Sequence, residues 1–313
     1  MRLTGIVSEI PAERIDALEV IQAAGGSRSE ARVFSKLFGI EQIAVLPHPQ
    51  HLLPAFMRLL DALALRPDDM PIDTLVYVHA LPVQPTADVG IAAALAARHP
   101  ALGAVSRRYE ISQHNCGGGF WGLQAIHRLF TARLAQRALL IVGDSLSAFP
   151  LGERYIPGCT ILGDAFVAML LDNRDDGMQL SSPWLAHRAE FWPGLFSESP
   201  QKNSFYQAHN EMIANALTGS AFSLASHTQL LPHNINRLTW LNYTRLYPEF
   251  TGRIDLGLLP DVGHCCAADP FLLLSRRLAD ARPLSAPLGL LSVGAGAFAG
   301  ACSLLPDRQT VAG

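Results

Sequence analysis

Three short, mostly apolar runs constrain the fold of this 313-residue chain more than any other feature. They are LVYVHA at residues 75–80, ALLIV at 138–142 and FVAMLL at 166–171. Runs of this kind are typical of strands that are covered on both faces. Stretches with helical spacing of apolar residues lie between them, at 89–97 and 120–136. The alternation of buried strands and helices predicts an α/β fold.

The C-terminal run LGLLSVGAGAFAGACSLL, residues 288–305, carries no charge over 18 residues. That length reaches the threshold for a membrane-spanning helix. Its glycines at 294, 296 and 300 fit two buried strands joined by a tight turn better, so we expect strands here and no membrane partner. The N-terminus shows no basic region followed by an apolar one. No signal peptide is therefore evident, and we expect a cytoplasmic protein.

The remaining segments show weaker patterns. Residues 173–177, NRDDG, indicate a polar turn. Residues 181–205 carry prolines, tryptophans and serines without clean periodicity, so we expect irregular structure there. Further strands are expected at 108–114 and 229–231, and further helices at 211–225, 236–246 and 270–281.

Charge and cysteine content exclude several classes of function. Lys+Arg 24 against Asp+Glu 27 gives a net charge of -3, and no basic run is present, which argues against nucleic acid as a partner. Five cysteines, with Cys265 and Cys266 adjacent, do not have the spacing of a disulfide framework or a zinc site. We therefore expect reduced thiols, no metal and no resident cofactor.

One cysteine stands apart by its context. Cys116 is followed by Gly117, Gly118 and Gly119 and then by the helical pattern. A thiol at the start of a helix lies near backbone N–H groups that favour its thiolate, which lowers its pKa and makes it a better nucleophile. The glycines would let the chain turn tightly and let a substrate approach the backbone. The alternative is a buried cysteine beside a flexible loop.

Two histidines follow short apolar strands in the second half of the chain. His233 lies in PHNINRLTW, where it could act as a base or an oxyanion donor, and Asn236 opens the helix that follows. His264 lies in DVGHCCAADP, in a loop before small residues. Structural alternatives exist for each: His233 or Asn236 as a helix cap, and His264 as a hydrogen-bonded histidine beside a turn glycine.

Glycine-rich loops enter two of the buried runs. GDAFVAMLL begins at Gly163, and SVGAGAFAG contains Gly294, Ala295 and Gly296. Backbone N–H groups in such loops could point at a developing oxyanion. Alternatively, the glycines serve close packing alone.

Taken together, the motifs follow one order along the chain. A cysteine in a glycine-rich loop is followed by Gly-Asp-Ala, His-x-x-Asn-Arg, Gly-His before small residues, and Gly-x-Gly-x-x-x-Gly. This order resembles the type III β-ketoacyl-[acyl carrier protein] synthases of the thiolase superfamily over nearly the whole chain. The resemblance implies a five-layered αβαβα fold of two similar halves, here residues 1–172 with the cysteine and 173–313 with the histidines. It also implies a homodimer.

The resemblance implies roles for individual residues. Cys116 would take an acyl group from a thioester, carried either by coenzyme A or by the phosphopantetheine of an acyl carrier protein. Its N–H and an N–H of the loop at 294–296 would form an oxyanion hole. His233 would polarise the carbonyl of the second substrate or act as base, and Asn236 would contribute to substrate binding.

The sequence departs from the family at three places. His264 stands where the family has an asparagine, which together with the histidine stabilises the enolate from a decarboxylating malonyl thioester. Residues 38–45, FGIEQIAV, lack the arginines that help hold coenzyme A, which favours a carrier protein as donor. A Gly-x-x-Val-Phe motif is also missing between Ser181 and Thr228, where Trp184 and Trp192 could shape a different acyl pocket or belong to the core.

Several functions therefore remain open. We favour an acyltransferase of fatty-acid-like or polyketide-type metabolism, with His233 or His264 as general base for an oxygen, nitrogen or carbon acceptor. The first alternative is decarboxylative Claisen condensation, and His264 could still donate a hydrogen bond for it. The second is a non-catalytic partner subunit of a heterodimeric condensing enzyme, although retention of both Cys116 and His233 argues against it. A thioester hydrolase would use the same acyl-enzyme, and the apolar Phe120 and Trp121 argue mildly against water access.

Overall fold

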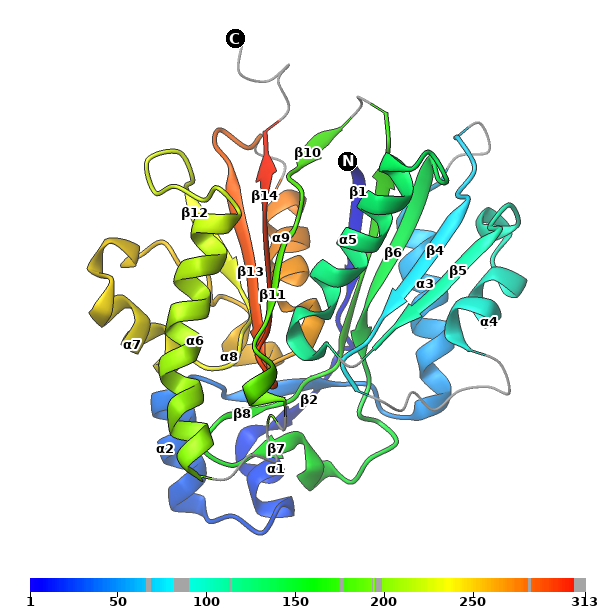
Figure 1. Ribbon diagram of the computed structural model, residues 1–313. Helices are drawn as coiled ribbons and strands as arrows, with labels where there is room; N and C mark the ends of the chain where they lie inside the picture. Colours follow the sequence, from blue (N-terminus) through cyan, green and yellow to red (C-terminus); the bar gives the residue numbers. More distant parts are fainter. Residues whose placement is uncertain are drawn as a thin grey trace.

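The computed structural model describes residues 1–65, 69–81, 90–112, 114–174, 177–192, 194, 199–280 and 283–306, with the backbone alone for 199–206. Its main sheet contains β1 (Arg2–Glu9), β4 (Thr74–Val78), β5 (Arg107–Ile111), β6 (Arg137–Asp144), β9 (Ala165–Asp172), β10 (Met178–Leu180), β11 (Trp184–His187), β12 (Gln229–Pro232), β13 (Leu288–Gly294) and β14 (Phe298–Leu305). The strand order is β12-β13-β14-β10-β1-β9-β6-β4-β5, and β11 pairs with β14 (Figure 1).

The helices are α1 (Ala17–Ala23), α2 (Arg28–Phe38), α3 (Leu52–Ala62), α4 (Ile91–Arg98), α5 (Gly118–Thr131), α6 (Ser199–Gly219), α7 (Arg237–Leu246), α8 (Leu259–Val262) and α9 (Asp269–Ala279). Short 3-10 turns are η1 (Pro49–His51), η2 (Pro100–Leu102), η3 (Asn115–Gly117), η4 (Leu151–Arg154), η5 (Ala189–Phe191), η7 (Pro248–Phe250) and η8 (Cys266–Ala268). Two small hairpins pair β2 (Glu13–Asp16) with β3 (Gln42–Val45) and β7 (Tyr155–Ile156) with β8 (Thr160–Ile161).

Two half-sheets face each other across a pair of central helices. One half consists of β5, β4, β6, β9 and β1, the other of β12, β13, β14 and β11, and the short β10 pairs with both β1 and β14. Helix α5 contacts β4 and β6 on one side and β14 on the other, while α9 contacts β1 and β9 as well as β12 and β13. Helices α3 and α4 cover the outer face of the first half, and α6 covers that of the second (Figure 1). The five-layered α/β fold is thus confirmed.

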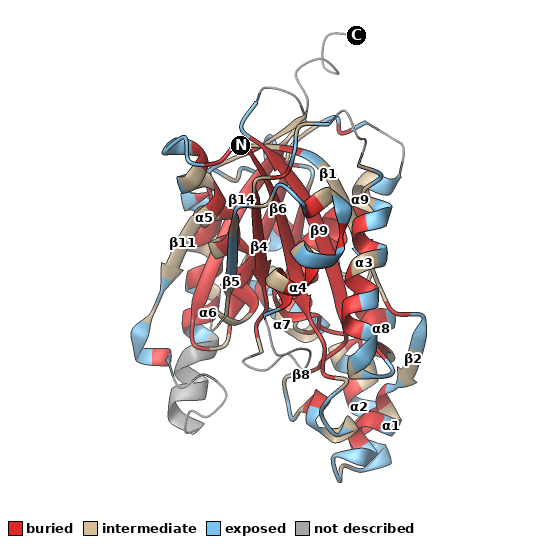
Figure 2. Ribbon diagram, turned by 90° about the vertical axis from the view of Figure 1, so that its right-hand side faces the viewer, coloured by how far each residue is buried: buried red, intermediate tan, exposed pale blue. Residues whose placement is uncertain are grey.

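Alternate residues of a strand belong to different layers of the core. On β4, Val76 and Val78 pack in the central cluster that contains Phe120 of α5. Tyr77, between them, packs in the outer cluster that contains Phe56 of α3. Both faces are therefore buried, as Figure 2 shows by the red strands at the centre of the molecule. This is why the strand sequences are apolar throughout rather than alternating.

The glycines after Cys116 serve packing rather than the tight turn that we expected from them. Gly117 has right-handed helical dihedrals, with φ -76° and ψ -12°. A Cβ at Gly119 would lie 2.3 Å from a ring carbon of Phe271 on α9, so no side chain fits there. The tight turn falls instead on Asn115, whose φ is 45°. The loop that contains Cys116 is thus held by close contact between the two central helices.

Most expected elements are present, and the exceptions have physical reasons. The two C-terminal strands are confirmed as β13 and β14, and no helix within the described residues has both the length and the apolar character needed to cross a bilayer. The irregular structure expected at 181–205 is wrong at Trp184–His187, where β11 forms by pairing with the distant β14, and from Ser199 on, where α6 begins. Helix α5 ends earlier than expected because Arg133 follows with φ 57°.

Two further differences concern boundaries. The helix expected at 211–225 begins at Ser199 and ends at Gly219 as α6, and the strand expected at 108–114 ends at Ile111. Parts of the expected elements lie outside the described residues, namely residues 89, 113, 175–176, 193, 195–198 and 281. The division of the chain after Asp172 stays a prediction.

Asp164, in the Gly-Asp-Ala motif, holds several loops together. Its carboxylate is fully buried and accepts the backbone N–H groups of Leu46 and Leu146, at 2.8 and 2.9 Å. It also receives two hydrogen bonds from the guanidinium of Arg154, at 2.9 and 2.8 Å. These contacts tie the segments after β3 and β6 to the start of β9, so the motif has a structural role.

We expect Asp164→Ala to lower the free energy of unfolding by about 3–5 kcal/mol, because the charge of Arg154 would remain buried without its partner. Urea denaturation measures the change. A matched control is Asp261→Ala, which removes a more exposed ion pair with Arg14 and should cost about 1 kcal/mol or less. Equal losses in the two variants would contradict this role of Asp164.

Candidate active site

Cys116 lies in η3, directly before α5, and is 7% exposed. Its loop is tied to the loop at 294–296, because the side-chain amide of Asn115 donates a hydrogen bond to the carbonyl of Ala295. A Cβ added at Gly294 would lie 2.7 Å from the backbone nitrogen of Cys116. The two loops are thus in close contact. The oxyanion hole that we expected between them stays a prediction.

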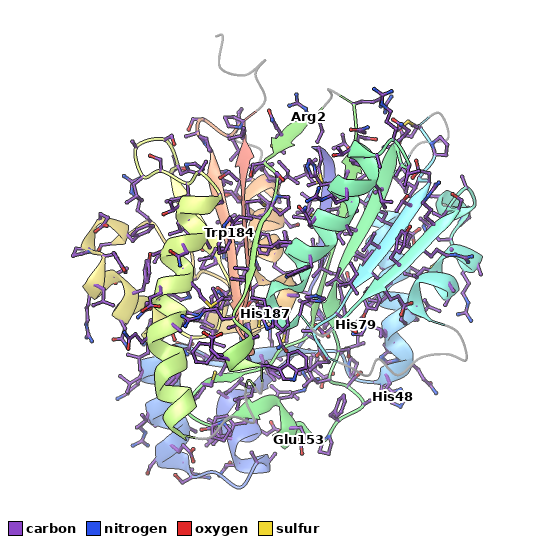
Figure 3. All side chains as sticks on the ribbon, in the orientation of Figure 1. Arg2, His48, His79, Glu153, Trp184 and His187 are labelled. Atoms are coloured by element: carbon purple, nitrogen blue, oxygen red, sulfur yellow. The ribbon has the colours of Figure 1, made fainter. Side chains whose placement is uncertain are left out.

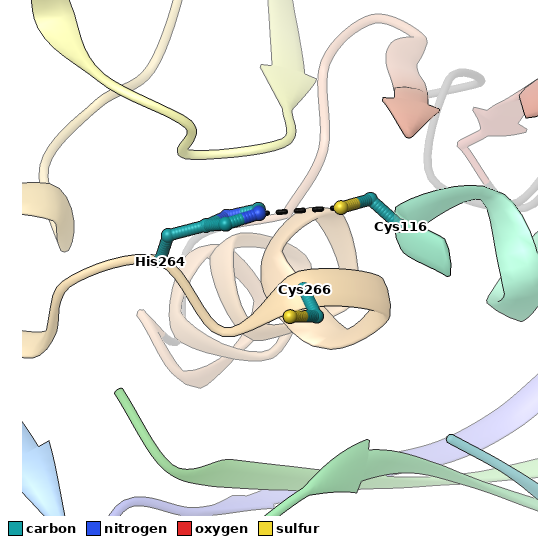
Figure 4. Close-up of side chains that lie close together, drawn as sticks. All are labelled: Cys116, His264 and Cys266. Atoms are coloured by element: carbon teal, nitrogen blue, oxygen red, sulfur yellow. Dashed lines mark hydrogen bonds between the residues drawn. The ribbon is translucent and has the colours of Figure 1, made fainter. Parts of the chain in front are cut away.

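His264 is within hydrogen-bonding distance of the thiol. Its Nε2 lies 3.2 Å from Cys116 Sγ (Figure 4). Its Nδ1 donates to Asp269 Oδ2 at 2.5 Å, which directs Nε2 towards the sulfur. A thiol, an imidazole and a carboxylate therefore form a continuous line of hydrogen bonds, in which both His264 and Asp269 are buried.

The charges in this line favour a thiolate. The S–H of Cys266 and the positive charge of His264 together outweigh burial and lower the pKa of Cys116 from 9.0 to about 5. Burial opposes the charged form of His264, but Asp269 and the thiolate raise its pKa from 6.5 to about 10. At neutral pH the pair therefore exists as thiolate and imidazolium, which is the reactive form of a cysteine nucleophile.

Cys266 is a neighbour of Cys116 that sequence reasoning missed. Its sulfur and the ligand atoms of Cys116 and His264 all lie within 4.8 Å of one another. Cys266 has a φ of 49°, a left-handed conformation that costs about 1–3 kcal/mol outside glycine. Strain of this kind is often found at functional sites.

His233 directly follows β12 and is fully buried. Its Nδ1 accepts the N–H of Val293 at 3.3 Å, so the proton of the neutral ring is on Nε2. That nitrogen lies 3.2 Å from Nε2 of His209 on α6. Burial lowers the pKa of His233 well below 6.5 and that of His209 to about 4, so both rings are neutral. The contact therefore occupies the ring nitrogen of His233 that carries the proton.

Asn236 is the N-cap of α7. Its side-chain oxygen accepts the N–H of Thr239 at 2.7 Å, and its amide nitrogen donates to the carbonyl of Cys159 at 2.8 Å. Both ends of the side chain therefore make contacts within the protein. The capping alternative describes Asn236 in this structure, and the expected substrate contact stays a prediction.

Apolar side chains surround the thiol. Cys116 belongs to a small buried cluster with Ala80, Leu146, Leu162 and Cys266, and the partly buried Leu81 and Ile156 pack against it. This cluster provides an apolar wall next to the sulfur, of the kind that an acyl chain could contact.

The two tryptophans of the 181–228 segment have different surroundings. Trp184, at one end of β11, packs against the cluster beneath α6, and a Cβ at Gly219 would lie 2.2 Å from its ring (Figure 3). The core alternative is therefore correct for Trp184. Trp192 is 59% exposed, and its ring centre lies 6.0 Å from that of Phe298, so it is not part of the core.

No family model matches this chain, and no curated protein matches it. Solved structures do. A 3-oxoacyl-(acyl carrier protein) synthase III from Pseudomonas aeruginosa has a TM-score of 0.75 at 19% identity, with 97% of each chain covered. The acyltransferase ChlB3 has a TM-score of 0.78 at 20% identity, and a variant of OleA from Xanthomonas campestris has 0.79 at 11%, again with 97% of each chain covered.

The fold is that of the type III ketosynthases. The resemblance inferred from the order of the motifs is thus confirmed at the level of the fold. Identities of this size show the fold and not the reaction. Within the type III ketosynthase fold, the chain places Cys116 and His264 in contact, and it places His233 against His209.

Sequence reasoning missed Asp269 and His209 as well as Cys266. Asp269 precedes Pro270 at the start of a helix, where an acidic residue is common for helix-dipole reasons alone. The only signal for another role is its place five residues after His264 in the same motif. His209 lies in a long helix whose pattern gives no sign that it faces a second histidine.

We expect Cys116 to react with iodoacetamide at a rate that stays nearly constant between about pH 6 and pH 9, because a pKa of about 5 keeps it ionised throughout. In His264→Asn the imidazolium is lost, so the pKa of Cys116 should rise and the rate should climb with pH, by up to about tenfold per pH unit below the new pKa. Mass spectrometry locates the modified residue. Cys159, whose pKa burial raises to about 12, serves as an internal control that should not react. A wild-type rate that climbs with pH as steeply as the variant's would refute the ion pair.

Proposed function

We propose that this protein is a cysteine-dependent acyltransferase, which loads an acyl group from a thioester onto Cys116 and passes it to a nucleophilic acceptor. The observation that carries the proposal is the line of hydrogen bonds from Cys116 through His264 to Asp269. This arrangement is that of an activated nucleophile, its base and the group that orients the base.

In the first half-reaction, the Cys116 thiolate attacks the carbonyl carbon of the thioester. The new carbon–sulfur bond forms as the old one breaks, and the imidazolium of His264 gives its Nε2 proton to the leaving sulfur. The N–H groups of Cys116 and of the loop at 294–296 would hold the oxyanion. His264 is then neutral and Cys116 carries the acyl group.

In the second half-reaction, neutral His264 accepts the proton of the acceptor's hydroxyl or amine as that group attacks the acyl carbon. The Cys116 thiolate leaves, and the imidazolium forms again beside it. Asp269 keeps Nδ1 protonated throughout, so the basic Nε2 always faces the reacting atoms. One histidine thus serves as acid and then as base.

The histidine contacts favour transfer over decarboxylative condensation. Condensation requires donors that stabilise an enolate. His233 Nε2 is in contact with His209, and His264 is bound to both a carboxylate and the thiol. A histidine with a carboxylate on Nδ1 is better suited to proton transfer than to neutral hydrogen-bond donation. The complete line of three groups also argues against a non-catalytic partner subunit.

The proposed donor is an acyl group on a phosphopantetheine arm, either of coenzyme A or of an acyl carrier protein. The missing arginines at 38–45 support the carrier protein. The apolar wall beside Cys116 supports an acyl chain rather than a charged group as cargo.

We expect intact-protein mass spectrometry to show an acyl adduct after incubation with a panel of acyl-coenzyme A and acyl-carrier thioesters. Cys116→Ala should form no adduct, because the nucleophile is missing. Asp269→Asn should still load but should deacylate about 100-fold or more slowly with an alcohol or amine acceptor, because His264 loses its orienting carboxylate.

The same panel includes malonyl thioesters, with release of carbon dioxide as the readout. Decarboxylation that depends on both Cys116 and His264 would show that the reaction is condensation and not acyl transfer. Absence of any adduct on the wild-type protein would contradict the proposal and favour the partner-subunit alternative.

We further propose that the protein forms a homodimer through β5. This strand is at the end of the sheet, and within the described residues no strand pairs with its outer edge. Its central residues Arg108, Tyr109 and Glu110 are exposed. An open edge of this kind is a template for pairing with a second copy.

Sedimentation equilibrium should show a dimer for the wild type and a weakened dimer for Tyr109→Lys, because a lysine on a strand edge opposes pairing. Val33→Lys on α2 replaces another exposed apolar residue, 52% exposed against 41% for Tyr109, and should leave the dimer intact. A monomeric wild type, or equal effects of both substitutions, would show that β5 does not mediate association.

A further inference from the structure

Three soft ligand atoms converge at the thiol of Cys116. Its Sγ, the Sγ of Cys266 and Nε2 of His264 all lie within 4.8 Å of one another, and all three residues are buried (Figure 4). Thiolate and imidazole are the preferred ligands of zinc, and two cysteines with one histidine make up a known set of three protein ligands for it.

The spacing suits a tetrahedral ion. Zinc–sulfur and zinc–nitrogen bonds of about 2.3 and 2.0 Å place neighbouring ligand atoms roughly 3.5–3.8 Å apart. Cys116 Sγ and His264 Nε2 are already 3.2 Å apart. For an ion to take the place of the shared proton, this pair would open by a few tenths of an ångström, and Cys266 Sγ, within 4.8 Å of both atoms, would move by about 1 Å at most. The fourth position would remain open for water.

The histidine is already oriented for metal binding. Its Nδ1 donates to Asp269 at 2.5 Å, and Asp269 also accepts the backbone N–H groups of Cys265 and Asn234, at 2.8 and 2.6 Å. A carboxylate on the second ring nitrogen is the usual partner of a histidine that binds zinc, because it fixes the tautomer and raises the basicity of the ligand.

We propose that Cys116, His264 and Cys266 form a zinc site whose occupation switches off acyl loading. Binding of zinc is independent of the proposed function, and only the inhibited reaction, acyl loading, rests on it. On binding, His264 and Cys266 each release a proton to solvent, and Cys116 enters as its thiolate. The electron pair that would attack a thioester is then shared with zinc, so loading stops until the ion leaves.

The test is a titration of the wild-type protein with cobalt(II), which reports ligand type and geometry by its absorption. We expect one equivalent to give the near-ultraviolet band of a thiolate–cobalt bond and the visible bands of a tetrahedral site. Zinc should displace it. Cys266→Ala should lower the zinc affinity about 100-fold, and Asp269→Asn about 10- to 100-fold. The matched control is Cys265→Ala, which removes the adjacent buried thiol, outside the group of three, and should bind as the wild type does.

Metal binding is measured without any thioester, so the two proposals fail separately. A thiolate–cobalt spectrum with no acyl loading by any donor would leave the metal site standing and refute the proposed function. Acyl loading that zinc does not slow, or a zinc affinity that Cys266→Ala leaves unchanged, would overturn the zinc site. Zinc should slow loading of the wild type and of Cys265→Ala, a chelator should restore it, and loading of Cys266→Ala should respond far less to zinc.

Discussion

The carboxylate of Asp269 is the group on which the rest of the site depends. It is buried at the start of α9 and accepts hydrogen bonds from His264, from the N–H of Cys265 and from the N–H of Asn234. Three donors to one carboxylate offset the cost of burying its charge. The same contacts join the two histidine-bearing segments to the central helix layer. Removing this anion would therefore change both the position and the charge of His264.

The two histidines predicted from the sequence differ in charge because their neighbours differ. His264 lies between a carboxylate and a thiolate, and these raise its pKa although it is buried. His233 is equally buried but faces another imidazole, so burial dominates and its pKa falls. Different surroundings can move the pKa values of two like groups apart, so that one site contains both a charged and a neutral histidine. For this reason the proposed function gives proton transfer to His264 rather than to His233.

The layered fold could be predicted because it depends on patterns that a single sequence displays. Strands buried on both faces are apolar throughout, and the order of the motifs matched one fold. Strand β11 could not be predicted, because its stability comes from pairing with β14, more than a hundred residues away. The same limit applies to the site. Cys116 and His264 were found by their motifs, but Cys266 and His209 become relevant only when folding places them beside Cys116 and His233. The sequence analysis singled out the glycines after Cys116 but predicted a tight turn from them. Their actual role is close packing, which depends on residues of other layers that lie far away in the sequence.

Strand β10 has a consequence for how substrates arrive. By pairing with both β1 and β14 it makes the two half-sheets continuous, and α5 and α9 are packed between them. A continuous sheet that encloses two closely packed helices resists separation of its halves around a ligand. For the proposed function, a thioester would therefore have to reach Cys116, which is 7% exposed, while the two half-sheets stay in place. A long, thin pantetheine arm would suit such an approach better than a bulky thioester.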